Sequence, residues 1–153
     1  MVLSSRGKYA TRALLDLTLH EDEGPVSIQE IAERQQIPLK YLEQILLALK
    51  RYGFVTSRKG PGGGYSLAKP PHSITLGAVV RAMEGPLAPI SCASVSGFAE
   101  CGCPEPATCG LRAVWKEARD ALAAVLDETT FADVRARHES LAARRERVLD
   151  YVI

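Results

Sequence analysis

No run of apolar residues in this 153-residue sequence approaches the roughly 18 that a membrane-spanning helix requires. The N-terminus also lacks the continuous apolar stretch of a secretory signal, and no internal repeat or low-complexity tract is present. These absences argue against a membrane protein and a repeat protein. We therefore expect a protein of the cytoplasm.

Motifs of cofactor-dependent enzymes are missing as well. The glycine run at 60–64 is not followed by the Lys-Ser/Thr pair of a phosphate-binding loop, and it lies between predicted strands rather than before a helix. The Cys-X-X-Cys pair that is typical of thiol redox enzymes does not occur. The sequence thus favours a binding protein over an enzyme.

The net charge of +1 conceals an uneven distribution of charge. Residues 34–69 hold seven basic residues and one acidic residue, Glu43, whereas residues 111–153 hold eight of each sign. A basic segment inside a nearly neutral chain is typical of a surface that meets a polyanion. The chain is long enough for one small domain with an appended element.

Periodicity and capping residues predict a mainly α fold with a small β-wing. Apolar residues at three- and four-residue spacing indicate helices over about 5–20, 28–35 and 38–51. A capping-box pair opens the second helix, and a proline suits the first turn of the third. Segments 54–57 and 65–68 are expected to form a hairpin with a glycine-rich turn. These predictions rest on Ser27 with Glu30, on Pro38, and on an expected buried stripe of Leu39, Leu42, Leu46 and Leu49.

The rest of the chain is expected to form one more core helix, a long loop and two further helices. A fourth helix is predicted over about 75–83, whereas 87–110 shows no periodicity and should be organised by a function or a bound ligand. Apolar residues then recur at helical spacing from Leu111 to Leu126, and a last helix runs from 131 to about 153 with a candidate break near His138. The predicted parts are a winged helix-turn-helix at 1–84, a cysteine-rich sensor loop at 85–110, and a dimerisation helix with a C-terminal helix at 111–153.

Two short helices joined by a tight turn predict a recognition helix that enters a major groove. Lys40, Glu43 and Gln44 lie on its outward face. Glutamate accepts a hydrogen bond from the amine of cytosine and glutamine pairs with adenine, while Lys40, Lys50 and Arg51 suit phosphates. Taken alone, these residues also fit a solvated helix face.

The hairpin favours the DNA interpretation. Its tip places Arg58 and Lys59 beside glycines that include Gly62 and Gly63. Small residues allow close approach to a phosphate backbone or a minor groove, where cations meet a strong negative potential. The expected partner is therefore double-stranded DNA.

The four cysteines fall within 18 consecutive residues. In a reducing compartment, such a group indicates metal or redox chemistry rather than disulfides. Zinc sites usually contain cysteines separated by roughly two to four residues. Here the intervals are eight, one and five residues, which favours an iron-sulfur cluster, of the 2Fe–2S or the 4Fe–4S type, over zinc. The candidate ligands are Cys92, Cys101, Cys103 and Cys109.

Residues 5–10 (SRGKYA), 31–35 (IAERQ), 41–44 (YLEQ) and 60–65 (GPGGGY) resemble the iron-sulfur cluster regulator (IscR) branch of the Rrf2 superfamily of bacterial repressors. The likeness extends from residue 1 to about 130. It implies a homodimer in which two winged-helix heads are crossed by a long pair of helices. It also implies a loop that ligates an iron-sulfur cluster, which controls affinity for a palindromic operator.

The resemblance assigns roles to single residues. Tyr41, Glu43 and Gln44 match positions that face the groove, and Lys59 matches a basic wing position. Cys109, followed by the apolar residues of the next helix, resembles the last cluster cysteine and the start of the dimer helix. Cys92 fits the first cysteine, and the middle one is either Cys103, by its spacing to Cys109, or Cys101, by its spacing to Cys92.

Two departures from the family pattern leave the fourth ligand open. Relatives place a histidine three residues after the last cysteine or an aspartate near the N-terminus, and this chain has Arg112 and Lys8 there. The candidate fourth ligand is whichever of Cys101 and Cys103 is not the middle cysteine. The alternative function is a cluster-free regulator whose cysteine loop binds zinc or a partner enzyme. A redox enzyme ranks below both, because the chain lacks a cofactor motif.

Overall fold

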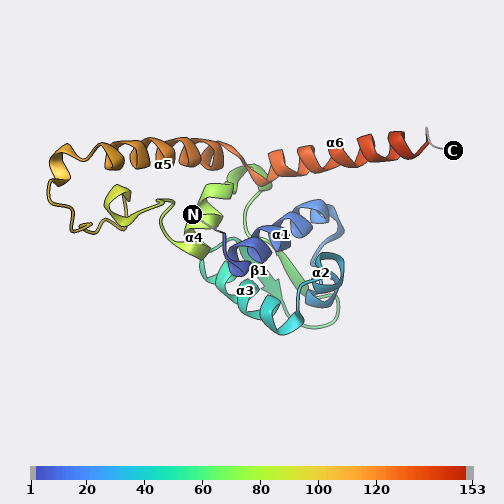
Figure 1. The fold of residues 1–153 in the computed structure, drawn as a ribbon. Coiled ribbons are helices and arrows are strands. Elements are labelled where there is room, and N and C mark those ends of the chain that lie inside the picture. Colours follow the sequence, from blue (N-terminus) through green and yellow to red (C-terminus); the bar gives the residue numbers. More distant parts are fainter. Residues whose placement is uncertain (1–2, 151–153) are drawn as a thin grey trace.

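The structure is a computed structural model that describes residues 3–150, and it shows a mainly helical head from which two long helices project (Figure 1). The head contains α1 (Ser5–Leu19), α2 (Ile28–Gln35), α3 (Leu39–Arg51), β1 (Val55–Arg58), β2 (Gly64–Leu67) and α4 (Leu76–Glu84). After the long loop follow α5 (Gly110–Glu128) and α6 (Phe131–Asp150). The expected mainly α fold with a small β-wing is confirmed.

Local sequence signals account for the ends of the first helices. The predicted capping box is present: the Ser27 hydroxyl accepts a hydrogen bond from the Glu30 amide at 3.3 Å, and the Glu30 carboxylate accepts one from the Ser27 amide at 2.9 Å. Gln36 ends α2 in the left-handed conformation with φ 49°, a geometry that glycine more often supplies. This residue makes the tight turn between α2 and α3.

The core of the head lies between α1, α2, α3 and α4, and it also receives Phe131 from the start of α6. The predicted burial of the α3 stripe is confirmed for Leu42, Leu46 and Leu49, and Ile45 is a further buried residue of this helix. It is wrong at Leu39, which is 40% exposed because it lies in the first turn, beyond the edge of the core.

The wing is an antiparallel hairpin in which Val55 pairs with Leu67 and Arg58 pairs with Gly64. Its strands include Arg58 and Gly64, which the sequence placed in the turn. Val26, before α2, adds a bridge to Tyr65 through hydrogen bonds of 2.8 and 2.7 Å. The base of the wing is therefore attached to the helix-turn-helix.

The projecting helices are anchored where one ends and the other begins. The Leu76 amide donates to the Thr129 carbonyl at 2.8 Å, and the Phe131 amide donates to the Ile74 carbonyl at 2.9 Å. α6 continues without interruption through His138, so the candidate break is wrong; the predicted end at about 153 lies outside the described residues. None of the helices within 3–150 is both long and apolar enough to cross a membrane.

Candidate nucleic-acid interface and cysteine site

The orientation of the helix-turn-helix depends on a carboxylate inside the head. Asp16 of α1 is only 1% exposed and accepts hydrogen bonds from the Arg34 guanidinium at 3.0 and 2.8 Å, and from the Gln35 side-chain amide at 3.0 Å. The bond to Asp16 raises the pKa of Arg34. Arg34 belongs to the basic segment of the sequence, but its guanidinium is bound to Asp16, so it fixes α2 and is not free to meet a phosphate.

The outward face of α3 carries the predicted polar residues. Lys40, Glu43, Gln44 and Arg51 are all exposed on it. Tyr41 is half-buried instead, with its ring edge-on to Tyr9 of α1 at a centroid distance of 5.7 Å and an interplanar angle of 79°. Much of Tyr41 is therefore used to hold α3 against α1.

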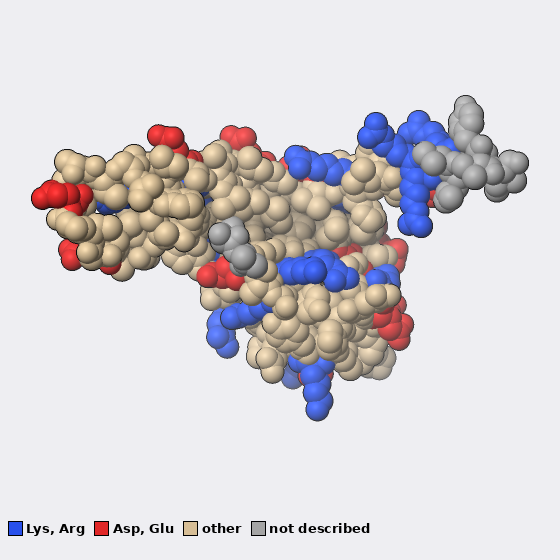
Figure 2. Space-filling view, viewed as in Figure 1, with Lys and Arg blue, Asp and Glu red and all other residues tan. Residues whose placement is uncertain are grey.

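The wing lies next to this face and is fixed to α3. The Lys50 ammonium at the end of α3 donates to the Ser57 hydroxyl of β1 at 2.6 Å. Arg58, Lys59 and Gly62 are exposed at the wing tip. Figure 2 shows basic side chains projecting from the lower edge of the head, the side on which α3 lies in Figure 1.

Gly63 is half-buried in the same turn. Its amide donates to the Gly60 carbonyl at 2.9 Å, and a Cβ at this position would collide with the backbone carbonyls of Arg58 and Gly60. Only glycine fits here without moving the turn. Gly63 thus shapes the loop that presents the two cations.

Arg6 also lies beside the outward face of α3, although no motif in the sequence indicates it. It lines a hollow of about 250 Å³ with Tyr41, Gln44 and Ile45 of α3. Its spacing of three residues from Tyr9 is the available sequence signal, because both then lie on one face of α1.

The four cysteines occupy different positions around one end of α5. Cys92 is 5% exposed in a short 3₁₀ turn at Ser91–Ala93, and Cys109 precedes α5 as its N-cap residue. Cys101 and Cys103 lie between them with their sulfur atoms 2.7 Å apart. Among the described residues, no three Cys, His, Asp or Glu side chains are arranged to hold a single metal ion.

The thiols nevertheless influence one another. Burial raises the pKa of Cys92, and its hydrogen bond to Cys101 adds to this effect. The hydrogen bond between Cys101 and Cys103 lowers the pKa of Cys101 and raises that of Cys103 to about 11. Cys109 also acts on Cys103 through its charge. The donor set, four neighbouring thiols in one loop, fits the chemistry of an iron-sulfur cluster, whose several irons bind separate thiolates.

Arg112 does not act as a substitute ligand in this arrangement. Its Nε donates to the Cys92 carbonyl at 2.9 Å, and its guanidinium lies 5.5 Å from the centre of the Phe98 ring. Together with Cys92, Cys101, Phe98 and two further loop residues, it lines a cavity of about 150 Å³. Arg112 therefore closes one side of the cysteine site and ties it to α5.

Comparison with known proteins identifies the family. The model of the Rrf2 family, described as iron-dependent transcriptional regulators, matches residues 3–137. The chain belongs to the Rrf2 family. Protein rrf2 of Nitratidesulfovibrio vulgaris Hildenborough is 42% identical over 134 residues, which cover 88% of this chain and 87% of that protein.

Solved structures agree with this assignment. CymR, the global cysteine regulator of B. subtilis, has a TM-score of 0.76 at 31% identity and covers 90% of this chain and 98% of its own. The IscR of T. potens has a TM-score of 0.74 at 33% identity and covers 92% of this chain and 90% of its own. The Rrf2-family chain is thus a winged-helix transcriptional regulator and not an enzyme.

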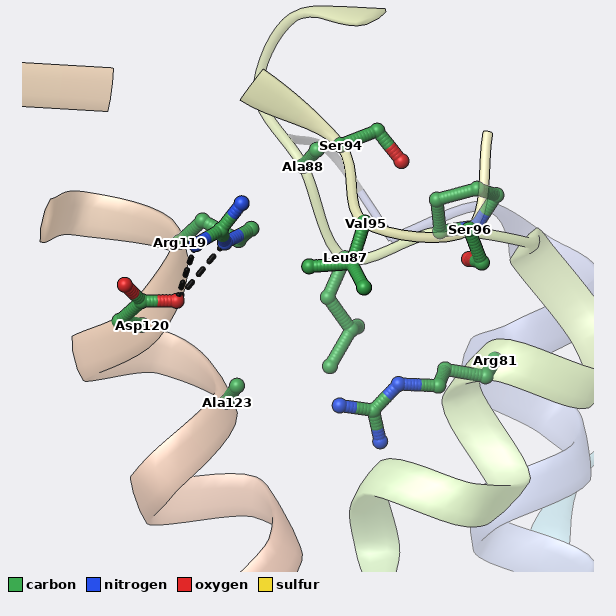
Figure 3. A pocket seen from close by; sticks show the side chains of 10 residues that line it. Arg81, Leu87, Ala88, Ser94, Val95, Ser96, Arg119, Asp120 and Ala123 are labelled. Atoms are coloured by element: carbon green, nitrogen blue, oxygen red, sulfur yellow. Dashed lines mark hydrogen bonds and ion pairs between the residues drawn. The ribbon is translucent and has the colours of Figure 1, made fainter. Parts of the chain in front are cut away.

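In this Rrf2-family chain, α5 forms hydrogen bonds with the cysteine loop and an ion pair with α4. Arg119, two helical turns after Arg112, donates to the Ala93 carbonyl and pairs with Asp120. Farther along α5, Asp127 accepts from Arg81 of α4 at 2.9 Å, and this ion pair lowers the pKa of Asp127. A cavity of about 80 Å³ lies between Arg81 and Arg119. Figure 3 shows Leu87 and Val95 of the loop beside it.

Proposed function

We propose that this Rrf2-family protein is a dimeric regulator that binds a palindromic DNA operator, with an affinity controlled by an iron-sulfur cluster in the cysteine loop. The observation that carries the proposal is the gathering of four thiols in a loop that is hydrogen-bonded to α5. The family assignment supports regulation of transcription. The cluster, the dimer and the operator are the parts that this proposal adds.

The DNA interface of the proposal consists of α3 and the wing. Glu43 and Gln44 read base edges in the major groove, while Lys40 and Arg51 bind phosphates. The wing cations Arg58 and Lys59 reach the adjacent backbone or minor groove, and Gly62 and Gly63 allow the close approach. The exposure of these side chains on α3 and at the wing tip supports this assignment.

The dimer of the proposal forms through α5. No residue of α5 is buried within the described chain. Val114, for example, is 58% exposed, although it is apolar and lies on one face with other large apolar side chains. Monomers rarely expose a contiguous apolar face of this length, and a second copy of α5 covers it in a symmetric way. The exposed apolar residues of this face are Leu111, Val114, Trp115 and Val125.

The cluster site of the proposal uses Cys92 and Cys109 as outer ligands and Cys101 or Cys103 as the middle one. The remaining cysteine is the candidate fourth ligand, because Arg112 is engaged with the Cys92 carbonyl. When bound, the cluster supplies a centre that responds to iron supply or oxidants. Arg112 and Phe98 shield the site on the side of Cys92.

A chain of contacts supports coupling between the loop and the DNA-binding head. Arg112 and Arg119 hold the backbone at Cys92 and Ala93 to α5, and Asp127 holds α5 to Arg81 of α4. A shift of the loop is therefore transmitted through a rigid helix to the head. In the dimer, such a shift changes the spacing of the two recognition helices.

The proposal is tested with full-length protein purified without oxygen. We expect a brown protein with visible absorption bands and with bound iron and sulfide. Cys92→Ala and Cys109→Ala should each abolish the cluster, one of Cys101→Ala and Cys103→Ala should do likewise, and the other should weaken it. Binding to a duplex selected by the wild-type protein from a random pool should differ between loaded and cluster-free protein.

Ser96→Ala, an exposed change in the same loop, is the matched control and should retain full iron and sulfide. Full iron and sulfide with an unaltered spectrum in Cys92→Ala or Cys109→Ala would contradict the ligand assignment. A colourless protein that contains zinc would instead support the cluster-free alternative.

A further inference from the structure

We infer that Arg6, at the start of α1, binds a DNA phosphate beside the recognition helix and so extends the protein–DNA interface beyond α3 and the wing. This inference rests on the proposed function and adds a contact to it. It assigns the α1 end of the head to the sugar-phosphate backbone that borders the major groove.

The packing of α1 on α3 puts Arg6 at that border. Tyr9 and Tyr41 meet edge to face, and each has a polar neighbour one helical turn away on the same face. These neighbours are Arg6 on α1 and Gln44 on α3, which line one hollow together. The aromatic contact thus sets the position of Arg6 relative to a residue that faces the groove.

The first turn of α1 is itself fixed. Glu84, the last residue of α4, accepts hydrogen bonds from the Ser4 hydroxyl at 2.5 Å and from the Gly7 amide at 3.0 Å. A Cβ at position 7 would collide with this carboxylate, so glycine allows the close approach. Because Glu84 already accepts from the Gly7 amide, the nearby Arg6 guanidinium, rather than that amide, is the group offered to an anion at this end of α1.

The other cations of α1 are differently placed. Arg12 donates to the backbone carbonyl and the side chain of Gln35, so it stabilises the end of α2. Lys8 is exposed but lies about 200° around the helix from Arg6, away from the side that meets α3. Arg6 is exposed, and within residues 3–150 it takes part in no ion pair. An exposed cation next to a groove-facing helix matches the charge of a phosphate.

The test compares the salt dependence of DNA binding for Arg6→Ala, Arg6→Lys and the matched control Lys8→Ala. The probe is the duplex that the wild-type protein selects from a random pool. One lost phosphate contact reduces the slope of log affinity against log salt concentration by about 1 for each protomer. We expect this reduction for Arg6→Ala, with the wild-type slope retained by Arg6→Lys and Lys8→Ala.

Circular dichroism and the oligomeric state establish that each variant is folded. An unchanged slope for Arg6→Ala on a duplex that wild-type protein binds would overturn the Arg6 contact and leave the proposed function standing. Equal losses for Arg6→Ala and Lys8→Ala would also overturn it, because only a diffuse charge effect would remain. A wild-type protein without salt-dependent binding would instead contradict the proposed function itself.

Discussion

Glu43 is an acidic side chain on a surface whose other charges are basic. It is exposed on α3, between Lys40 and the wing side of the helix. A carboxylate close to phosphates is unfavourable unless it accepts a hydrogen bond from a base, and cytosine offers such a donor in the major groove. The proposed interface therefore assigns Glu43 to the selection of sequence rather than to overall affinity.

Glu43→Ala should consequently alter sequence preference more than overall binding. We expect a change of about 1–3 kcal/mol at one base pair, measured by titration of duplexes that differ by single substitutions. Glu33→Ala, which removes an exposed carboxylate from α2, is the control and should leave the preference unchanged. Equal weakening on all duplexes would show that Glu43 does not contact a base.

At the scale of elements, α5 has an apolar face that the described residues of the chain do not cover. Its polar face carries the arginines that hold the loop, while its apolar face is exposed. Val114 lies on the apolar face, and Ala113, also exposed, lies about 100° away on the polar side. These neighbours allow a matched comparison.

If the proposed dimer forms through α5, Val114→Glu should yield a monomer with a folded head, whereas Ala113→Glu should remain dimeric. A charge left unpaired in an apolar interface costs about 3 kcal/mol or more, or roughly a hundredfold in the dimer dissociation constant. Light scattering after size-exclusion chromatography measures the mass. A dimeric Val114→Glu would place the interface elsewhere, for example on α6.

The sequence predicted the elements best where a single local signal decides the structure. The spacing of Ser27 and Glu30 specified the start of α2, and apolar periodicity specified the course of α5. The sequence did not predict contacts between residues that are far apart in the chain. Nothing near Arg34 indicates that Asp16, eighteen residues earlier, would bind it.

In the candidate site, too, local features were predicted and long-range contacts were not. The exposed face of α3 and the grouping of the cysteines could be read from spacing, because neighbours in sequence define them. The placement of Arg6 beside Gln44 and the bond from Arg112 to Cys92 depend on how whole helices pack, and no short motif records that packing. Likewise, α6 runs on through His138, because the polar residues there interrupt its apolar pattern but contain no helix breaker.

At the scale of the whole molecule, the core of the head depends on a residue that follows the cysteine loop and α5 in the sequence. Phe131, at the first position of α6, is fully buried in the core between α1 and the segment before α4. Phe131→Ala should therefore lower the free energy of unfolding by about 3–5 kcal/mol. Leu141→Ala on the same helix, at a site that is 64% exposed, should change it by less than about 0.5 kcal/mol.

Urea denaturation followed by circular dichroism measures both values. A similar, small effect of the two changes would mean that the head completes its core without α6.

The burial of Phe131 restricts which segments can be exchanged when a chimera is made from two such regulators. A chimera that joins residues 1–84 to a foreign sensor would leave an empty space where Phe131 packs, and it would also lose the Leu76–Thr129 and Phe131–Ile74 backbone hydrogen bonds. Exchange of sensors, in the laboratory or in evolution, therefore has to replace the loop and α5 while retaining the segment around residues 129–135. The last part of the head's core is therefore encoded after the cysteine loop and α5.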